Sequence, residues 1–149
     1  MIKIEKKKRS TASSKDLFEL ISDIKSYPDF IPWCKSSIIE REVHDYFFAR
    51  LEMKFLMFSG SFISKVSMDK YEKRINALGV KGPFNYLEAN WIFDEYDKGT
   101  LVSLILELDL KNKILEDIIE KNSENLINKT ILSFEKRILT VSENGKNHF

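Results

Sequence analysis

The chain has 149 residues, of which 43% are hydrophobic and 32% are charged, a composition typical of one folded globular domain rather than a disordered chain. Its 24 basic and 23 acidic residues nearly cancel, which removes a global electrostatic argument for nucleic-acid binding, to DNA in particular. A single cysteine excludes an internal disulfide and a four-cysteine zinc site.

The chain begins with a pattern typical of a strand and continues with one typical of a helix. Apolar and charged residues alternate over residues 2–10, which predicts a strand. Ser13 is the expected N-cap of the helix, with Asp16 three residues later and apolar residues at helical spacing after it. Because Pro28 disfavours helical backbone before it, we expect this helix to end near residue 26 or 27.

From residue 35 to residue 110 the hydrophobic period is two, which indicates antiparallel strands. The clearest run covers residues 46–58, where one face carries Phe47, Ala49, Leu51, Met53, Phe55 and Met57. Together with the other alternating runs, it predicts about six strands after the first helix. These runs lie near residues 36–43, 46–58, 62–68, 72–80, 87–93 and 102–110.

A long helix is expected to close the fold, from about residue 113 to residue 139. The order strand, helix, strands and long helix predicts an α+β fold, in which a curved antiparallel sheet of about seven strands wraps around the last helix. We expect a single domain over residues 1–140 and a polar tail over residues 141–149. A curved sheet and a straight helix cannot touch everywhere, so a cavity is expected between them.

Two short segments combine aromatic residues with prolines. The first runs from Tyr27 to Cys34 and the second from Gly82 to Glu88, continuing to Trp91 and Phe93. Prolines stiffen the backbone and aromatic rings present flat apolar surface, whereas neither segment supplies the groups that catalysis needs. This combination favours a protein that holds an apolar molecule over one that transforms it.

Residues 23–34, Asp-Ile-Lys-Ser-Tyr-Pro-Asp-Phe-Ile-Pro-Trp-Cys, resemble a signature of the coenzyme Q-binding, START-like proteins. This family is also described as polyketide cyclase/dehydrase-like, and it contains the bacterial ribosome association toxin. Gly82-Pro83-Phe84, with Leu87, Glu88, Trp91 and Phe93, resembles its second signature, and residues 134–137 resemble the end of its final helix. The resemblance implies a helix-grip fold (START/Bet v 1-like), a tunnel for a polyisoprenoid quinone and a role in respiratory electron transfer.

We expect the ligand to contact the two motifs, the inner strand faces and the last helix. The residues expected at the tunnel and its mouth are Tyr27, Pro28, Phe30, Pro32, Trp33, Met53, Phe55, Phe84, Leu87, Trp91, Leu115, Ile119 and Asn122. Each also has a structural alternative: Tyr27, Phe30 and Trp33 could close the end of the core, and the methionines could fill it. Asn122 could donate to a quinone oxygen or lie at the helix edge.

Other features carry less functional information. The basic run over residues 6–9 could contact anionic lipid or ribosomal RNA, but a solvated edge strand guarded by lysines explains it as well. Cys34 has no base beside it in sequence, and His44 and His148 do not form a metal site or a catalytic triad. No catalytic residue, metal or cofactor is therefore expected, and ubiquinone enters only as a bound ligand.

Three functions remain open at this point. The first is non-enzymatic binding and delivery of ubiquinone or a similar isoprenoid lipid, with transient contact to a membrane surface. The second is binding to a ribosomal subunit so that subunit association is blocked, and the third is an aromatase or cyclase. Neither a membrane-spanning segment nor a secretory signal is visible, so we expect a cytoplasmic protein that also acts peripherally at the inner face of the respiratory membrane.

Overall fold

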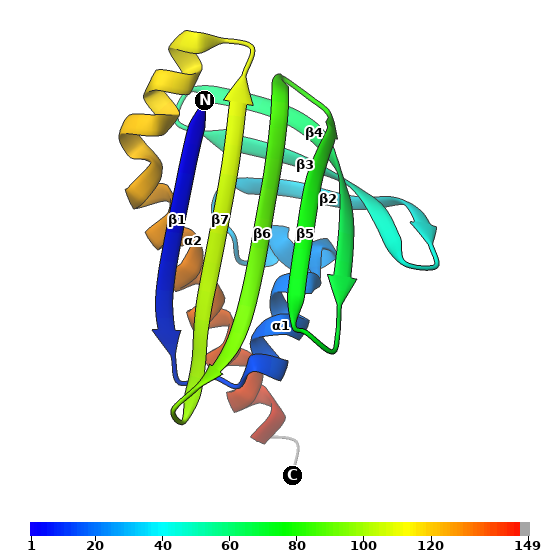
Figure 1. Cartoon of the computed structure of the whole chain (residues 1–149), viewed down its shortest axis with the longest axis vertical. Helices are drawn as coiled ribbons and strands as arrows, with labels where there is room; N and C mark the ends of the chain where they lie inside the picture. The colour runs from blue at the N-terminus through cyan, green and yellow to red at the C-terminus, as the bar shows by residue number, and fades with distance from the viewer. Residues whose placement is uncertain (147–149) are drawn as a thin grey trace.

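A seven-stranded antiparallel sheet and a long C-terminal helix form the protein (Figure 1). The structure is a computed structural model that describes the backbone of residues 1–146 and the side chains of residues 1–140. Its elements are β1 (Ile2–Ser10), α1 (Ser14–Ser22), η1 (Ile24–Asp29, a 3-10 helix), β2 (Cys34–Val43), β3 (Tyr46–Phe55), β4 (Phe58–Asp69), β5 (Arg74–Lys81), β6 (Phe84–Tyr96), β7 (Gly99–Leu110) and α2 (Lys113–Lys146).

The strand order is β1-β7-β6-β5-β4-β3-β2, so six strands follow α1 in sequence, as predicted. The first strand pairs with the last, with Ile2 opposite Leu108 and Ser10 opposite Thr100. This leaves β1 and β2 as the two edges of the sheet. The lysine-rich segment therefore lies on an edge strand, where charged side chains discourage pairing with another chain.

The α-helix after β1 is shorter than predicted. Ser13 caps α1 and its hydroxyl accepts a hydrogen bond from the Asp16 amide at 3.1 Å, as expected for an N-cap. The α-helix then ends at Ser22, because Asp23 adopts a non-helical ψ of 67°. A separate 3-10 helix, η1, continues to Asp29 and contains Pro28, so the expected end near residue 26 or 27 was wrong.

The prediction of one strand across residues 46–58 was also wrong. Phe55 of β3 pairs with Phe58 of β4, which leaves only two residues for the hairpin turn. Leu56 has a φ of 56°, the left-handed conformation that a two-residue hairpin requires. Met57 consequently leaves the inner face and is 95% exposed.

The last helix is longer than predicted, since α2 continues to Lys146 instead of ending near residue 139. The added segment contains no proline, and its one glycine, Gly145, lies in the final turn. The backbone of residues 141–146 is therefore helical, so the prediction of a polar tail over residues 141–149 was wrong for this part. The remainder of that tail, including His148, lies outside the described residues. No helix in the described part of the chain is long and apolar enough to cross a membrane.

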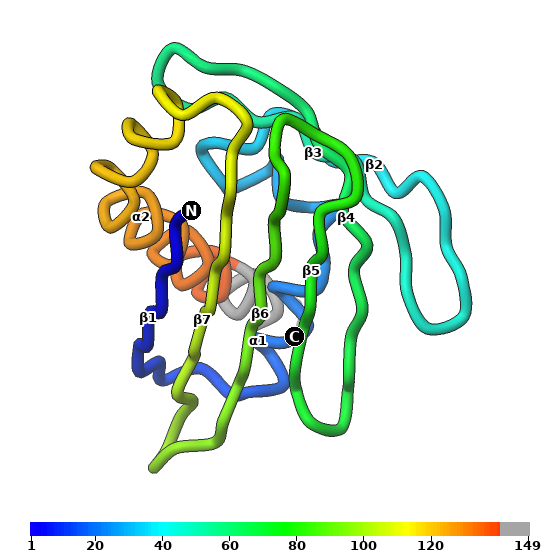
Figure 2. Tube along the Cα trace, turned by 45° about the horizontal axis from the view of Figure 1, so that its top comes forward, coloured from blue at the N-terminus to red at the C-terminus, as the bar shows by residue number. Residues whose placement is uncertain are grey.

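Both α-helices lie on one side of the sheet. Figures 1 and 2 show α2 running along the β1–β7 edge and crossing behind the sheet towards α1. The contacts of α2 agree, because it packs on β1, β7 and α1. The sheet curves around this side, so its inner face carries the core. By the pleat of the strands, the inner face includes Phe93, Val102 and every second residue from them. A bulge between Phe84 and Tyr86 shifts the register of β6, so Phe84, opposite Leu110, also faces inward.

Candidate functional site

The inner face of the sheet divides into two parts that differ in burial. One part, which we call the closed half, lies where α1, η1 and the C-terminal part of α2 meet the sheet. Its side chains form a continuous buried cluster. The cluster contains Leu17, Phe18, Ile21, Ile24, Tyr27, Ile31, Cys34, Ala49, Leu51, Val66, Ile75, Phe93, Val102 and Phe134.

The 27–34 motif packs into this closed half. The rings of Tyr27, Phe30 and Phe134 contact one another edge to face, with centroids 5.5 to 6.1 Å apart. The Tyr27 hydroxyl donates to the carbonyl of Ile21, and burial raises the pKa of this hydroxyl far above its ordinary value. Arg137 lies over the Phe30 ring at 5.4 Å. These contacts fasten the motif to α1 and α2.

Trp33 marks the boundary of the closed half. Its indole N–H donates to the Thr130 hydroxyl of α2 at 2.9 Å, and its carbonyl accepts from the Lys54 amide of β3 at 2.8 Å. The side chain is half-buried. Trp33 therefore connects the middle of α2 to the sheet through one residue, and the inner face beyond it has a different character.

The second part, which we call the open half, lies towards the start of α2. At this end the inward-facing residues Ile2 and Leu110 are buried. A further set of inward-facing apolar strand residues keeps part of its surface in contact with solvent. They are Met53 and Phe55 of β3, Phe62 of β4, Phe84 and Leu87 of β6, and Leu106 and Leu108 of β7. Inward-facing apolar side chains that remain half-exposed form a surface that an apolar ligand could cover.

The N-terminal part of α2 extends the open half. Leu115, Ile119 and Asn122 precede Thr130 at helical spacing and are all half-buried, so they continue the face that carries the contact to Trp33. The Asn122 amide donates to the carbonyl of Ile118 at 2.7 Å, within its own helix. Asn122 thus lies beside the apolar surface with one N–H already engaged.

Phe84 lies against β5 and β4 in this open half. Its ring meets that of Phe62 edge to face, 6.4 Å between centroids. A Cβ atom added to Gly79 would come within 2.5 Å of the Phe84 ring, so the glycine is needed for this close approach. A Cβ on Gly60, opposite Met53, would meet nothing within 4 Å. The open half therefore has a packed wall at Gly79 and free space at Gly60.

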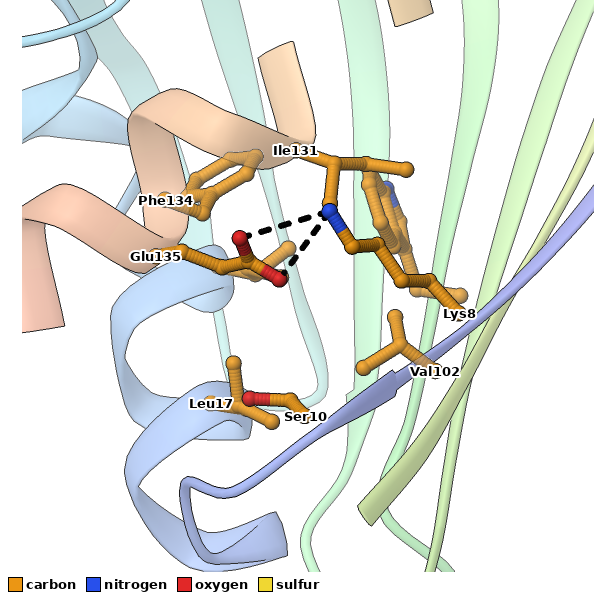
Figure 3. A pocket seen from close by; sticks show the side chains of 9 residues that line it. Lys8, Ser10, Leu17, Val102, Ile131, Phe134 and Glu135 are labelled. Atoms are coloured by element: carbon orange, nitrogen blue, oxygen red, sulfur yellow. Dashed lines mark hydrogen bonds and ion pairs between the residues drawn. The ribbon is translucent and has the colours of Figure 1, made fainter. Parts of the chain in front are cut away.

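A small cavity of about 10 Å³ lies in the closed half, between β1, α1 and α2 (Figure 3). This volume is close to the minimum for one water molecule. Leu17, Val102, Ile131 and Phe134 supply its apolar lining, and Lys8 forms an ion pair with Glu135 at 3.3 Å across it. This cavity is too small for a lipid.

The titratable groups give little support for acid–base chemistry. In the part of the chain whose side chains are described, the strand positions that face α2 in the open half carry no aspartate, glutamate or histidine. Burial raises the pKa of the Cys34 thiol to about 11, which keeps it protonated and unreactive at neutral pH. No group of three or more potential metal ligands occurs among the described residues.

The structure distributes the predicted ligand residues over both halves. Tyr27, Pro28, Phe30 and Trp91 belong to the closed half, Trp33 lies at the boundary, and Pro32 is exposed. The open half brings together Met53, Phe55, Phe84, Leu87, Leu115, Ile119 and Asn122. Phe62, Leu106 and Leu108 also lie there but were not predicted as ligand residues, although strand alternation already put them on the inner face.

Known proteins share the fold of this chain, and a family model matches most of its sequence. The model of a family described as "Polyketide cyclase / dehydrase and lipid transport" matches residues 10–135. A ribosome association toxin, RatA, of Rickettsia prowazekii is 32% identical over 126 residues, which cover 83% of this chain and 86% of that protein.

Two solved structures extend the comparison. The 18 kDa protein CC1736 of Caulobacter crescentus has a TM-score of 0.84 and 25% identity, covering 96% of this chain and 99% of that one. A START superfamily protein of Mycobacterium smegmatis has a TM-score of 0.81 and 20% identity, covering 93% and 98%. These similarities confirm the predicted helix-grip, START-like fold and the resemblance that the two motifs carry.

Proposed function

The chain belongs to the polyketide cyclase/dehydrase and lipid transport family, and from that premise we propose that it binds an elongated apolar lipid, an isoprenoid quinone in particular. The ligand would lie against the open half and leave unchanged. The observation that carries this proposal is the half-exposed apolar surface on the inner face, from Met53 across Phe62 and Leu87 to Ile119. Such surface is a cost to a protein that does not use it.

Apolar burial would supply most of the affinity. Each CH₂ group removed from water contributes about 0.8 kcal/mol, so an isoprenoid tail can bind tightly with few polar contacts. The open half also suits such a tail because methionine and phenylalanine adapt to flexible chains, as at Met53 and Phe55. Stability is supplied separately by the closed half, which keeps the sheet and α2 fixed when the ligand leaves.

The polar group of the ligand would lie near α2. A quinone oxygen accepts hydrogen bonds, and the Asn122 amide has a second N–H beyond the one that bonds Ile118. Asn122 is a polar residue on the α2 face that carries Leu115 and Ile119. We therefore expect Asn122→Leu to keep tail binding and to weaken the preference for a quinone over a hydrocarbon of equal length.

The test is to purify the protein without detergent from a quinone-producing host and to extract it with organic solvent for mass spectrometry. A near-stoichiometric isoprenoid quinone supports the proposal and gives the length of the tail. A folded protein that yields no lipid, and that stays empty after incubation with quinone-containing vesicles, contradicts it. Gly60→Phe, which fills the free space opposite Met53, is the matched variant and should lower loading by at least about tenfold.

A second function is favoured by a separate observation, the relative named as a ribosome association toxin. On this alternative the chain binds a ribosomal subunit and interferes with subunit association. Co-sedimentation with isolated subunits at moderate salt tests it, with the joined ribosome as the comparison. Binding to a subunit together with an empty open half would favour this function over lipid carriage.

A further inference from the structure

We propose that the end of the sheet beside the open half docks on an anionic lipid bilayer, a role that rests on the proposed lipid binding. This upper end carries the β3–β4 turn, the β5–β6 turn and the β7–α2 connection. Strand pairing puts all three at the same end of the sheet, because Phe55 pairs with Phe58, Ile63 with Lys81 and Phe84 with Leu110. Figure 1 shows these connections along the top of the molecule.

Exposed aliphatic side chains project from this upper end. Met57 is 95% exposed and Leu56 is 57% exposed, and both form the tip of the β3–β4 turn. Ile114, in the first turn of α2, is 75% exposed. Asn112 caps that turn by accepting from the amides of Ile114 and Leu115 at 3.0 and 3.1 Å, which holds Ile114 in place. Exposed aliphatic tips of this kind can enter the boundary region of a bilayer.

Lysines surround these tips. The three connections contain four lysines and no aspartate or glutamate. They are residues 54–58, 81–84 and 110–114. Lys113 is paired with Asp109 at 2.7 Å. Lys54, Lys81 and Lys111 are exposed, and among the described side chains they form no ion pair. The carboxylates at this end, Asp109 and Glu116, pair with Lys113 and the N-terminal ammonium, so Lys54, Lys81 and Lys111 are left to face an anionic membrane surface.

The opposite, lower end has a different composition. Its two turns, residues 69–74 and 94–98, contain Asp69, Glu72, Asp94, Glu95 and Asp97 among four basic residues. Tyr71 is 97% exposed there, so apolar exposure alone does not distinguish the two ends. The combination of aliphatic tips with unpaired lysines occurs at the upper end, and the mixed charge of the lower end does not favour an anionic surface.

The chemistry of the tips favours lipid over nucleic acid. A phosphate-rich RNA would also attract the lysines, but nucleic-acid surfaces usually add aromatic side chains on which bases stack. Leu56, Met57 and Ile114 cannot stack on bases, whereas they gain from entering the hydrocarbon boundary. Phe55 and Phe58, which flank the tip, belong to the half-exposed inner face, so a lipid could pass from the bilayer to the open half over a short apolar path.

The experiment compares sedimentation of the full chain with vesicles of phosphatidylcholine alone and with vesicles that contain one third phosphatidylglycerol. We expect binding to the anionic vesicles, weakened by salt. The affinity of Lys54→Gln/Lys81→Gln/Lys111→Gln for anionic vesicles should be lower by on the order of a hundredfold, about fivefold for each lysine. Leu56→Asn/Met57→Ser should lose about tenfold or more, with Asn suited to the positive φ of residue 56.

The matched control is Lys70→Gln/Tyr71→Ser/Lys98→Gln at the lower end, which should bind the vesicles as the wild type does. Binding of a water-soluble short-tail quinone, followed by quenching of Trp33 and Trp91 fluorescence without vesicles, should be equal in all variants.

The outcomes separate the docking surface from the proposed function. Quenching without any vesicle binding contradicts the docking surface and leaves the proposed function standing. Vesicle binding that depends on the upper end, without quenching, supports the surface and contradicts the proposed function. If the wild type does not bind vesicles, and the upper-end variants bind ribosomal subunits more weakly than the wild type, the proposal of a bilayer is contradicted and RNA is the partner of this surface.

Discussion

The closed and open halves of the inner face are built from the same seven strands, yet they are covered differently. Around Phe134 the side chains pack against α1, η1 and α2, and the cavity beside Phe134 measures about 10 Å³. Around Leu87 and Met53 the strands keep their apolar alternation, but α2 lies along the β1–β7 edge and leaves them half-exposed. The difference indicates that one half stabilises the domain while the other is available to a ligand.

The largest expected effect is on the closed half. Phe134→Ala removes a ring that is 2% exposed and contacts Tyr27, Phe30 and Trp91, so it should lower the free energy of unfolding by about 3–5 kcal/mol. The matched variant Leu87→Ala in the open half should cost no more than about 2 kcal/mol, since its side chain is already half-exposed. Urea denaturation measures both, and equal losses would remove the distinction between the halves.

Two glycines sharpen the comparison within the open half. Gly79→Ala places a Cβ 2.5 Å from the Phe84 ring and should lower the free energy of unfolding by about 1–3 kcal/mol. Gly60→Ala meets nothing within 4 Å and should leave stability unchanged or raise it by up to about 1 kcal/mol. Thermal unfolding of the two variants gives the difference directly. A loss at Gly60 as large as at Gly79 would mean that the space opposite Met53 is filled.

The boundary between the halves depends on one side-chain hydrogen bond. Thr130→Val keeps the shape of the residue but leaves the Trp33 indole N–H without its acceptor, which should cost about 1 kcal/mol because the indole is only half-buried. Trp33 should then become more accessible to acrylamide quenching. Thr130→Ser, which retains the hydroxyl, is the control. A variant as stable and as weakly quenched as the wild type would show that the bond does not hold the boundary.

The smallest expected effect concerns reactivity rather than stability. Because burial raises the pKa of Cys34 to about 11, the thiol should react slowly with iodoacetamide at pH 8 and faster as the pH approaches that value. The folded state holds this proton more tightly than the unfolded state, so stability is fully present below the pKa of the unfolded thiol. It decreases as the pH rises from there towards about 11. Rapid labelling of the folded protein at pH 8 would contradict burial of Cys34 in the closed half.

The sequence predicted which strand residues face inward, but it did not predict which of them the helices cover. Alternation identified Leu51, Phe62 and Leu106 as inward-facing, and the pleat of the strands makes that inference reliable. It failed at Met57, because a period of two continues through a two-residue turn as if no turn were present. The helix end at Ser22 was missed because a 3-10 segment can contain Pro28 and still follow helical apolar spacing.

The division into halves could not have been predicted from the sequence. It depends on where α2 crosses the sheet, and that is fixed by contacts between distant residues. Trp33 and Thr130 are 97 positions apart, and Lys8 and Glu135 are 127 apart. No local pattern reports such pairs, so the two aromatic motifs looked alike in sequence, although the first packs into the closed half and Phe84 of the second lies in the open half.

The most direct test of a lipid-binding open half is a titration with a water-soluble short-tail isoprenoid quinone, followed by NMR of the methyl groups. We expect shifts that saturate with ligand for the methyl groups of Met53, Leu87, Leu106, Leu108, Leu115 and Ile119. The methyl signals of Leu17, Ile21, Val66, Ile75 and Val102 in the closed half should stay in place. Shifts confined to the closed half would contradict lipid binding at the open half. So would the absence of any shift at the highest concentration at which the ligand dissolves.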